Sequence, residues 1–194
     1  MKKLLIPFFL LGLLLNACKK DDAAAIKPSE NPVASLVNGS GWKISTRNNG
    51  AYEVGYVFSA SAKGKITQVG SQMGDPGNYI LSIWDVDTKK LLRQKNVEQA
   101  SPNKFSVSTV DDLVIEKDKK YLVSINNTSN GSTKLYSVLE KTPASSTTIF
   151  PISSGNIVIQ KSVYSASSVP VFPTIDYSST NGFYGFADIT FVPD

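Results

Sequence analysis

The chain has 194 residues, among them no histidine and one cysteine, and 20 Lys and Arg against 16 Asp and Glu give a net charge of +4. Ser-His-Asp and Cys-His catalysis, zinc sites of the usual His/Cys kind and haem ligation through histidine therefore lose residues that they require. The basic residues are interspersed with acidic ones, so no basic patch predicts nucleic-acid binding.

The first residues have the charge order of a secretory signal. Lys2 and Lys3 precede an apolar run from Leu4 to Leu15, and charged residues resume at Lys19. The run is shorter than the roughly 20 residues that cross a bilayer as a helix. We therefore predict that residues 1–17 are a cleaved signal peptide.

The signal ends in Leu15-Asn16-Ala17-Cys18, which resembles the lipobox of bacterial lipoproteins. In that family the cysteine is diacylated and becomes the new N-terminus, which implies a membrane anchor of palmitate-like chains on Cys18. Two or more acyl chains give stable anchoring. The alternative is a soluble secreted protein that is cut after Ala17 and carries a free thiol.

The residues after the cysteine are two lysines and two aspartates, Lys19 to Asp22. They resemble the tags that send lipoproteins of Bacteroidetes to the outer face of the outer membrane. The resemblance implies an outer-membrane, lipid-anchored protein at the cell surface. Residues 18–38 contain three consecutive alanines, two prolines and few large apolar side chains, so we expect a flexible tether there.

From residue 39 onward the pattern predicts one all-β domain, 39–194. Short runs rich in Val, Ile, Tyr, Phe and Thr alternate with Gly, Asn, Asp, Pro and Ser. The predicted strands are 41–45, 52–59, 64–72, 79–85, 91–97, 105–107, 113–115, 121–126, 132–138, 156–164 and 184–192. We expect a two-sheet antiparallel β-sandwich of the jelly-roll or carbohydrate-binding-module kind.

Two runs are informative about position in a sheet. Residues 79–85 are apolar on both faces, which predicts a central strand with Trp84 in the core, and residues 91–95 look like its more exposed hairpin partner. In the last run Ala187, Ile189 and Phe191 share a face, so we expect the chain to close with a strand docked in a sheet.

Five of these runs, taken in order, resemble an uncharacterised bacterial β-sandwich domain found attached to surface and carbohydrate-active proteins. They are Glu53 to Phe58, Gly64 to Thr67, Leu81 to Trp84, Lys117 to Ser124 and Ala187 to Phe191. The resemblance covers about residues 42–194 and implies an accessory or binding role without naming a ligand.

A candidate sugar-binding stretch lies between residues 172 and 184. Sugar binding uses aromatic faces together with amide or carboxylate partners for hydroxyl groups. Tyr177 and Tyr184 are the expected platforms, and Asp176 and Asn181 the hydroxyl partners. The alternative is an ordinary long connection whose aromatic residues cover the sandwich edge. Trp42, at the start of the domain, fits either a lid over the core or a ligand contact.

Glu53 and Asp188 resemble in their placement an acidic pair that holds a structural calcium ion in several carbohydrate-binding sandwiches. Calcium takes about six to eight oxygen ligands, so further ligands would be needed. No other cofactor is expected.

Three functions remain open. The first is a surface-anchored, non-catalytic domain that binds a polysaccharide or another cell-envelope ligand. The second is a structural or adhesion subunit that contacts another protein through a sandwich edge. The third is a glycoside hydrolase that uses two carboxylates, although no pair stands out in the sequence.

Overall fold

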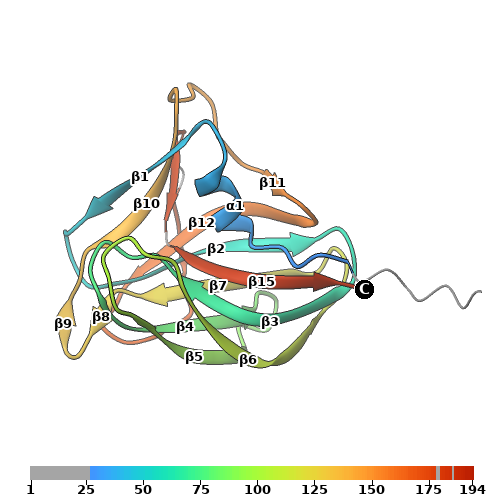
Figure 1. Cartoon of the computed structure of the whole chain (residues 1–194), viewed down its shortest axis with the longest axis horizontal. Coiled ribbons are helices and arrows are strands. Elements are labelled where there is room, and N and C mark those ends of the chain that lie inside the picture. Colours follow the sequence, from blue (N-terminus) through green and yellow to red (C-terminus); the bar gives the residue numbers. More distant parts are fainter. Residues whose placement is uncertain (1–26, 178–179, 185) are drawn as a thin grey trace, which may run out of the picture.

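A computed structural model of the chain describes residues 27–177, 180–184 and 186–194. The largest sheet has seven strands, all paired antiparallel (Figure 1). In spatial order they are β11 (Ile152–Ser154), β12 (Ile157–Ala166), β2 (Tyr52–Ala60), β7 (Lys120–Asn126), β4 (Gly77–Asp85) and β5 (Leu91–Gln99), and β13 (Ile175–Tyr177) pairs with the second half of β12.

Two smaller antiparallel sheets face this large one. The first consists of β1 (Trp42–Arg47), β10 (Tyr136–Lys141) and β14 (Gly182–Tyr184), and the second of β15 (Ala187–Pro193), β3 (Gly64–Ser71) and β6 (Ser106–Ile115). A short hairpin, β8 (Thr128–Ser129) and β9 (Ser132–Thr133), completes the strands that are described.

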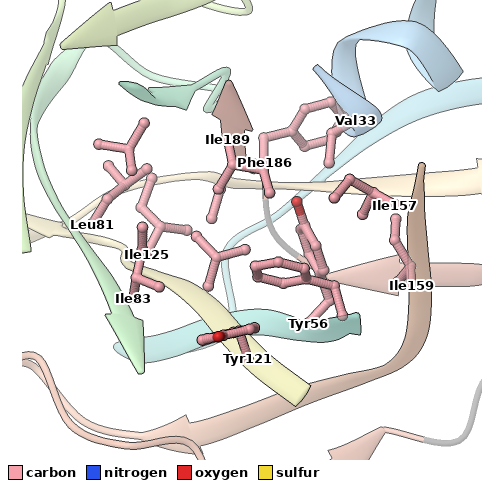
Figure 2. Packing of buried hydrophobic residues seen from close by; sticks show 14 of the residues in the cluster. Val33, Tyr56, Leu81, Ile83, Tyr121, Ile125, Ile157, Ile159, Phe186 and Ile189 are labelled. Atoms are coloured by element: carbon pink, nitrogen blue, oxygen red, sulfur yellow. The ribbon is translucent and has the colours of Figure 1, made fainter. Parts of the chain in front are cut away.

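One hydrophobic core lies between the large sheet and the two small ones (Figure 2). Side chains from all three sheets belong to it, including Tyr56, Leu81, Ile125 and Ile159 from the large sheet, Leu139 and Phe183 from the first small sheet, and Ile66 and Ile189 from the second. Each large apolar side chain buried in this way contributes about 1.5–3 kcal/mol. The expected all-β antiparallel sandwich is confirmed.

Strand β4 is central, as its sequence predicted, because β7 and β5 pair with its two edges. Its Tyr79, Leu81 and Ile83 side chains are in the main core. Trp84 is 8% exposed and belongs to a smaller cluster with Val57, Leu122 and Val163, against which Phe172 packs. The expectation that Trp84 is a core residue is confirmed.

The expected flexible tether is wrong for its last residues. Pro32–Asn38 form a short helix, α1, with Val33 in the main core (Figure 2), and Glu30 makes an isolated antiparallel bridge to Phe191 of β15. Proline at the helix start fits there because it has no N–H to leave unpaired. Composition suggested disorder, but Val33, Leu36 and Val37 supply an apolar stripe that packs on the domain.

The domain therefore includes residues from about Glu30 onward, whereas the remaining predicted tether residues up to 26, Cys18 and the signal peptide lie outside the described residues. In the part of the chain that is described, no helix has both the length and the apolar character needed to cross a membrane.

Several strand limits differ from the prediction. The runs 105–107 and 113–115 belong to one strand, β6, at the edge of its sheet. Asp111 and Asp112 are exposed in the middle of this strand, so the apolar pattern is interrupted there and the sequence predicted two strands. The run 132–138 is divided between β9 and β10, and the run 184–192 between β14 and β15. Strands β11 and β13 are three residues each and were not predicted.

Candidate functional site

Four tyrosines from four strands surround a hollow of about 160 Å³ at one end of the sandwich. Its lining residues are Asn49, Tyr52, Val54, Tyr136, Tyr164 and Tyr184, and we call it the tyrosine hollow. A second hollow of about 200 Å³ shares Asn49, Tyr136 and Tyr184 with it and adds Arg47, Val138, Glu140, Tyr177, Asn181 and Gly182; we call it the polar hollow.

Strand register brings these residues together from distant parts of the sequence. Tyr164 of β12 lies opposite Val54 of β2, and Tyr52 stands two residues before Val54, on the same face of the strand. On the facing sheet Tyr136 begins β10, and Tyr184 ends β14 opposite Val138. The hollow therefore forms where the large sheet meets the first small sheet.

The four rings contact one another edge to face in a closed circuit. The ring centroids are separated by 5.9 Å for Tyr52–Tyr136, 5.8 Å for Tyr136–Tyr184, 5.6 Å for Tyr184–Tyr164 and 6.0 Å for Tyr164–Tyr52, with interplanar angles of 73–76°. Such geometry is favourable because the positive ring edge meets the negative face of its neighbour. These contacts hold the four rings in place around the tyrosine hollow.

Asn49, in the turn between β1 and β2, holds two of the phenol groups. Its side-chain oxygen accepts the Tyr136 hydroxyl at 2.8 Å, and its backbone carbonyl accepts the Tyr52 hydroxyl at 3.3 Å. Burial raises the pKa of Tyr136 and of Tyr184 above the ordinary value of 10. Tyr136 and Tyr184 are therefore neutral phenols at physiological pH.

The polar hollow has charged groups on one side and an aromatic pair on the other. Glu140 accepts hydrogen bonds from Ser45 Oγ at 2.7 Å and Arg47 Nη2 at 2.6 Å, and Lys43 Nζ lies 3.2 Å from its other oxygen. The Ser45 hydrogen bond, with help from the two cations, lowers the pKa of Glu140, which is therefore ionised. Opposite, the Tyr177 ring lies 4.1 Å from the Tyr184 ring at an angle of 33°.

Three of the predicted ligand-binding residues, Tyr177, Tyr184 and Asn181, line the polar hollow together. Asp176 does not, because neighbouring residues of a strand face opposite ways. Its carboxylate contacts Lys161 Nζ at 2.7 and 2.8 Å and lines a separate hollow beside Phe172.

Trp42 lines neither hollow. Its ring packs edge to face on the buried Phe183 with centroids 6.0 Å apart, and Lys141 Nζ lies 4.8 Å from its centroid. It covers the core, which is the first of the two roles that its position allowed.

Sequence reasoning missed Tyr52, Tyr136 and Tyr164. Each is a single aromatic residue at or near the start or end of a strand, and they are 28 to 112 residues apart in the chain. Strand order alone relates them, and single aromatic residues carry no local signal for a site.

Glu53 and Asp188, the suggested calcium pair, occupy different sheets and have separate partners. Asp188 is buried against the N-terminal segment and accepts N–H bonds from Val33 at 3.1 Å, Ala34 at 2.8 Å and Ile189 at 2.9 Å. Burial raises its pKa to about 6, and the three N–H bonds oppose that shift.

Glu53 is buried on the face of β2 that carries Val57. Trp84 Nε1 donates to Ser124 Oγ at 3.0 Å, and Ser124 Oγ donates to Glu53 Oε1 at 2.5 Å, while the described residues give Glu53 Oε2 no hydrogen bond within normal geometry. Burial raises the pKa of Glu53 to about 8, so the side chain is mostly a neutral acid at pH 7. Within residues 27–177, 180–184 and 186–194, no three acidic residues, cysteines or histidines are grouped as metal ligands would be.

No protein-family model matches this chain, and no curated protein matches it significantly.

Proposed function

We propose that this protein is a lipid-anchored surface protein whose β-sandwich binds a glycan or another cell-envelope ligand without catalysis. The observation that carries the proposal is the convergence of five tyrosines, Tyr52, Tyr136, Tyr164, Tyr177 and Tyr184, on two adjoining hollows. The leader and Cys18 supply the anchor in this proposal.

The chemistry of the hollows suits a ligand that combines apolar faces with hydroxyl groups. Ring faces pack on the apolar side of a sugar, and the Glu140–Arg47 pair with the Asn181 side chain offers acceptors and donors at the rim. The combined volume of the two hollows is at the lower end of the roughly 300–1,000 Å³ typical of small-ligand sites. That size favours one or two sugar units, or a headgroup, over a long chain.

The carboxylate content of the site favours binding over hydrolysis. Glu140 is the one carboxylate among the described residues that line either hollow, and its oxygens are paired with Arg47, Lys43 and Ser45. A standard glycosidase uses two carboxylates about 5–9 Å apart across the scissile bond. The hydrolase alternative therefore has no support in this site.

Binding is tested with a glycan array and with affinity gels that contain bacterial polysaccharides. We expect retention that Tyr177→Ala and Tyr184→Ala reduce about tenfold, because each removes a stacking face. Tyr177→Phe keeps the ring and should retain most binding. The matched control is Val114→Ala, which changes an exposed apolar residue of β6 away from the hollows.

Two results would contradict glycan binding at these hollows. One is retention that is unaffected by both tyrosine substitutions. The other is no retention on any polysaccharide together with co-purification of one protein partner, which would favour the adhesion subunit.

Anchoring is tested separately from binding. We expect the wild-type protein to incorporate radiolabelled palmitate and to sediment with membranes, and Cys18→Ala to lose both properties. Protease added to intact cells should degrade the domain if the Lys19–Asp22 tag directs surface exposure. A Cys18→Ala variant that still incorporates palmitate would overturn the assignment of the anchor.

A further inference from the structure

The tyrosine hollow has the form of an aromatic box. Its four rings meet at 73–76° in a closed circuit and line one small volume together with Asn49 and Val54. The face of an aromatic ring carries negative charge density, and a cation within about 6 Å of a ring centroid is attracted to it. Several faces around one hollow add their attraction.

No charged side chain competes for that volume. Among the described residues, the lining of the tyrosine hollow contains neither an acid nor a base. Arg47, the nearest cation in the adjoining polar hollow, is held by Glu140 at 2.6 Å. The box is therefore open to a positive group from a ligand.

The lining also favours one kind of cation over another. A bare ammonium brings three N–H donors and is strongly hydrated, so it needs acceptors to replace water. The Asn49 oxygens already accept the Tyr52 and Tyr136 hydroxyls. A methylated ammonium has apolar methyl groups that match the rings and Val54, and it keeps its positive charge.

The size of the hollow suits such a group. Its volume of about 160 Å³ is close to the roughly 150 Å³ of a cavity that accommodates benzene. A trimethylammonium group is of comparable size.

We infer that the tyrosine hollow binds a methylated ammonium group of the choline type, carried by the ligand whose remaining part occupies the polar hollow. This inference rests on the proposed function, because it names the chemical group that the same site recognises. The group could belong to a phosphocholine substituent on a glycan or to a phospholipid headgroup, and both present the same cation.

The direct test is titration of the purified protein with choline and with 3,3-dimethyl-1-butanol, which has the same shape without the charge. Calorimetry and tyrosine fluorescence report the affinity. We expect choline to bind about tenfold more tightly than the neutral alcohol, as several cation–π contacts in a partly desolvated site would give. Equal affinities for the two probes, or no binding of choline at millimolar concentration, would overturn the inference.

Matched variants locate the binding. Tyr164→Phe keeps the ring face, so choline affinity should stay within about threefold, whereas Tyr164→Leu removes one wall and should weaken it about tenfold. Because Tyr164→Leu could also loosen the fold, its melting temperature is measured beside that of Tyr164→Phe. A folded Tyr164→Leu variant that binds choline as tightly as the wild type would contradict the assignment.

Two further probes distinguish the source of the group. Sedimentation with phosphatidylcholine vesicles, compared with phosphatidylglycerol vesicles, would identify a lipid headgroup, and binding of a phosphocholine-bearing polysaccharide would identify a glycan. Glycan binding that is unaffected by excess choline would overturn this inference and leave the proposed function intact. Choline binding without any glycan binding would support the inference and would contradict a glycan as the ligand that carries the group.

Discussion

Asp188 and Glu53, which are at most 1% exposed, show opposite ways of placing a carboxyl group away from water. Asp188 lies where α1 meets β15 and accepts three backbone N–H bonds. Glu53 accepts one short bond from Ser124, and no described residue donates a hydrogen bond of normal geometry to its second oxygen. Both pKa values are raised by burial, to about 6 for Asp188 and about 8 for Glu53.

The difference teaches how donors set the protonation state of a buried acid. N–H donors stabilise the ionised form, so they hold the Asp188 pKa closer to its ordinary value despite complete burial. Glu53 has fewer donors, and its neutral form is favoured at pH 7. Asp188 therefore acts as a hydrogen-bond acceptor that holds the N-terminal segment on the domain. Glu53 is a carboxyl group that takes up a proton when the chain folds at neutral pH.

The largest expected effect comes from removing the Asp188 acceptor. Asp188→Ala leaves buried N–H groups of Val33 and Ile189 and the part-buried N–H of Ala34 without this acceptor, so we expect the free energy of unfolding to fall by about 4 kcal/mol at pH 7. Urea denaturation measures this. Asp188→Asn keeps one acceptor oxygen and should lose less. A loss below about 1 kcal/mol for Asp188→Ala would mean that the segment docks without these bonds.

An intermediate effect is expected from pH. Because the folded pKa of Glu53 is raised from 4.5 to about 8, the folded protein keeps a proton that the unfolded chain has lost. That stabilisation is complete below about pH 4.5 and disappears as pH rises through 8. Asp188 acts with the same sign, but only below about pH 6.

Between pH 6.5 and 8 the dependence therefore belongs to Glu53, and we expect unfolding free energy to decrease by about 2 kcal/mol over this interval. Denaturant titrations at several pH values measure the slope, and Glu53→Gln should remove it because an amide does not titrate. If the unfolding free energy of the wild type does not change with pH, or if its pH dependence persists in Glu53→Gln, Glu53 is not the group that titrates in this interval.

The smallest effect is expected at Tyr56, whose buried hydroxyl has no hydrogen-bond partner in the part of the chain that the structure describes. Burial, and secondarily the charge of Asp188, raises the Tyr56 pKa well above 10, so the hydroxyl stays neutral. Tyr56→Phe keeps the edge-to-face contact with Phe183 and should change stability by no more than about 0.5 kcal/mol. A loss above 1 kcal/mol in thermal or urea unfolding would show that the hydroxyl has a partner in solution.

Much of the fold was predictable because burial leaves a period of two in the sequence. Strand β4, with apolar residues on both faces, and strand β15, with Ala187, Ile189 and Phe191 on one face, were placed correctly as buried strands. Prediction failed where residues gain structure from contacts across the sequence. The segment around Val33 orders because Asp188 and Phe191, more than 150 residues away, supply its partners.

The candidate site was predictable only in part for the same reason. Tyr177, Asn181 and Tyr184 lie close in sequence, so a local cluster of aromatic and polar residues predicted them. Tyr52 and Tyr136 join the site through the pairing of β2 and β10 with other strands, which no local pattern encodes. Asp176, the other expected hydroxyl partner, lines a different hollow from Tyr177 because adjacent strand residues point to opposite faces.

The docking of Glu30 has a mechanical consequence. Glu30 exchanges two backbone hydrogen bonds with Phe191, and its carboxylate accepts the backbone N–H of Asn156, which lies beside Ser61 at the far end of β2 from Tyr52. Nine residues of β2, from Tyr52 to Ala60, separate the two ends by about 26 Å. Tension applied to the chain ahead of Glu30 would be carried by β15 and this end of β2, and the tyrosine hollow would lie outside the path of the load.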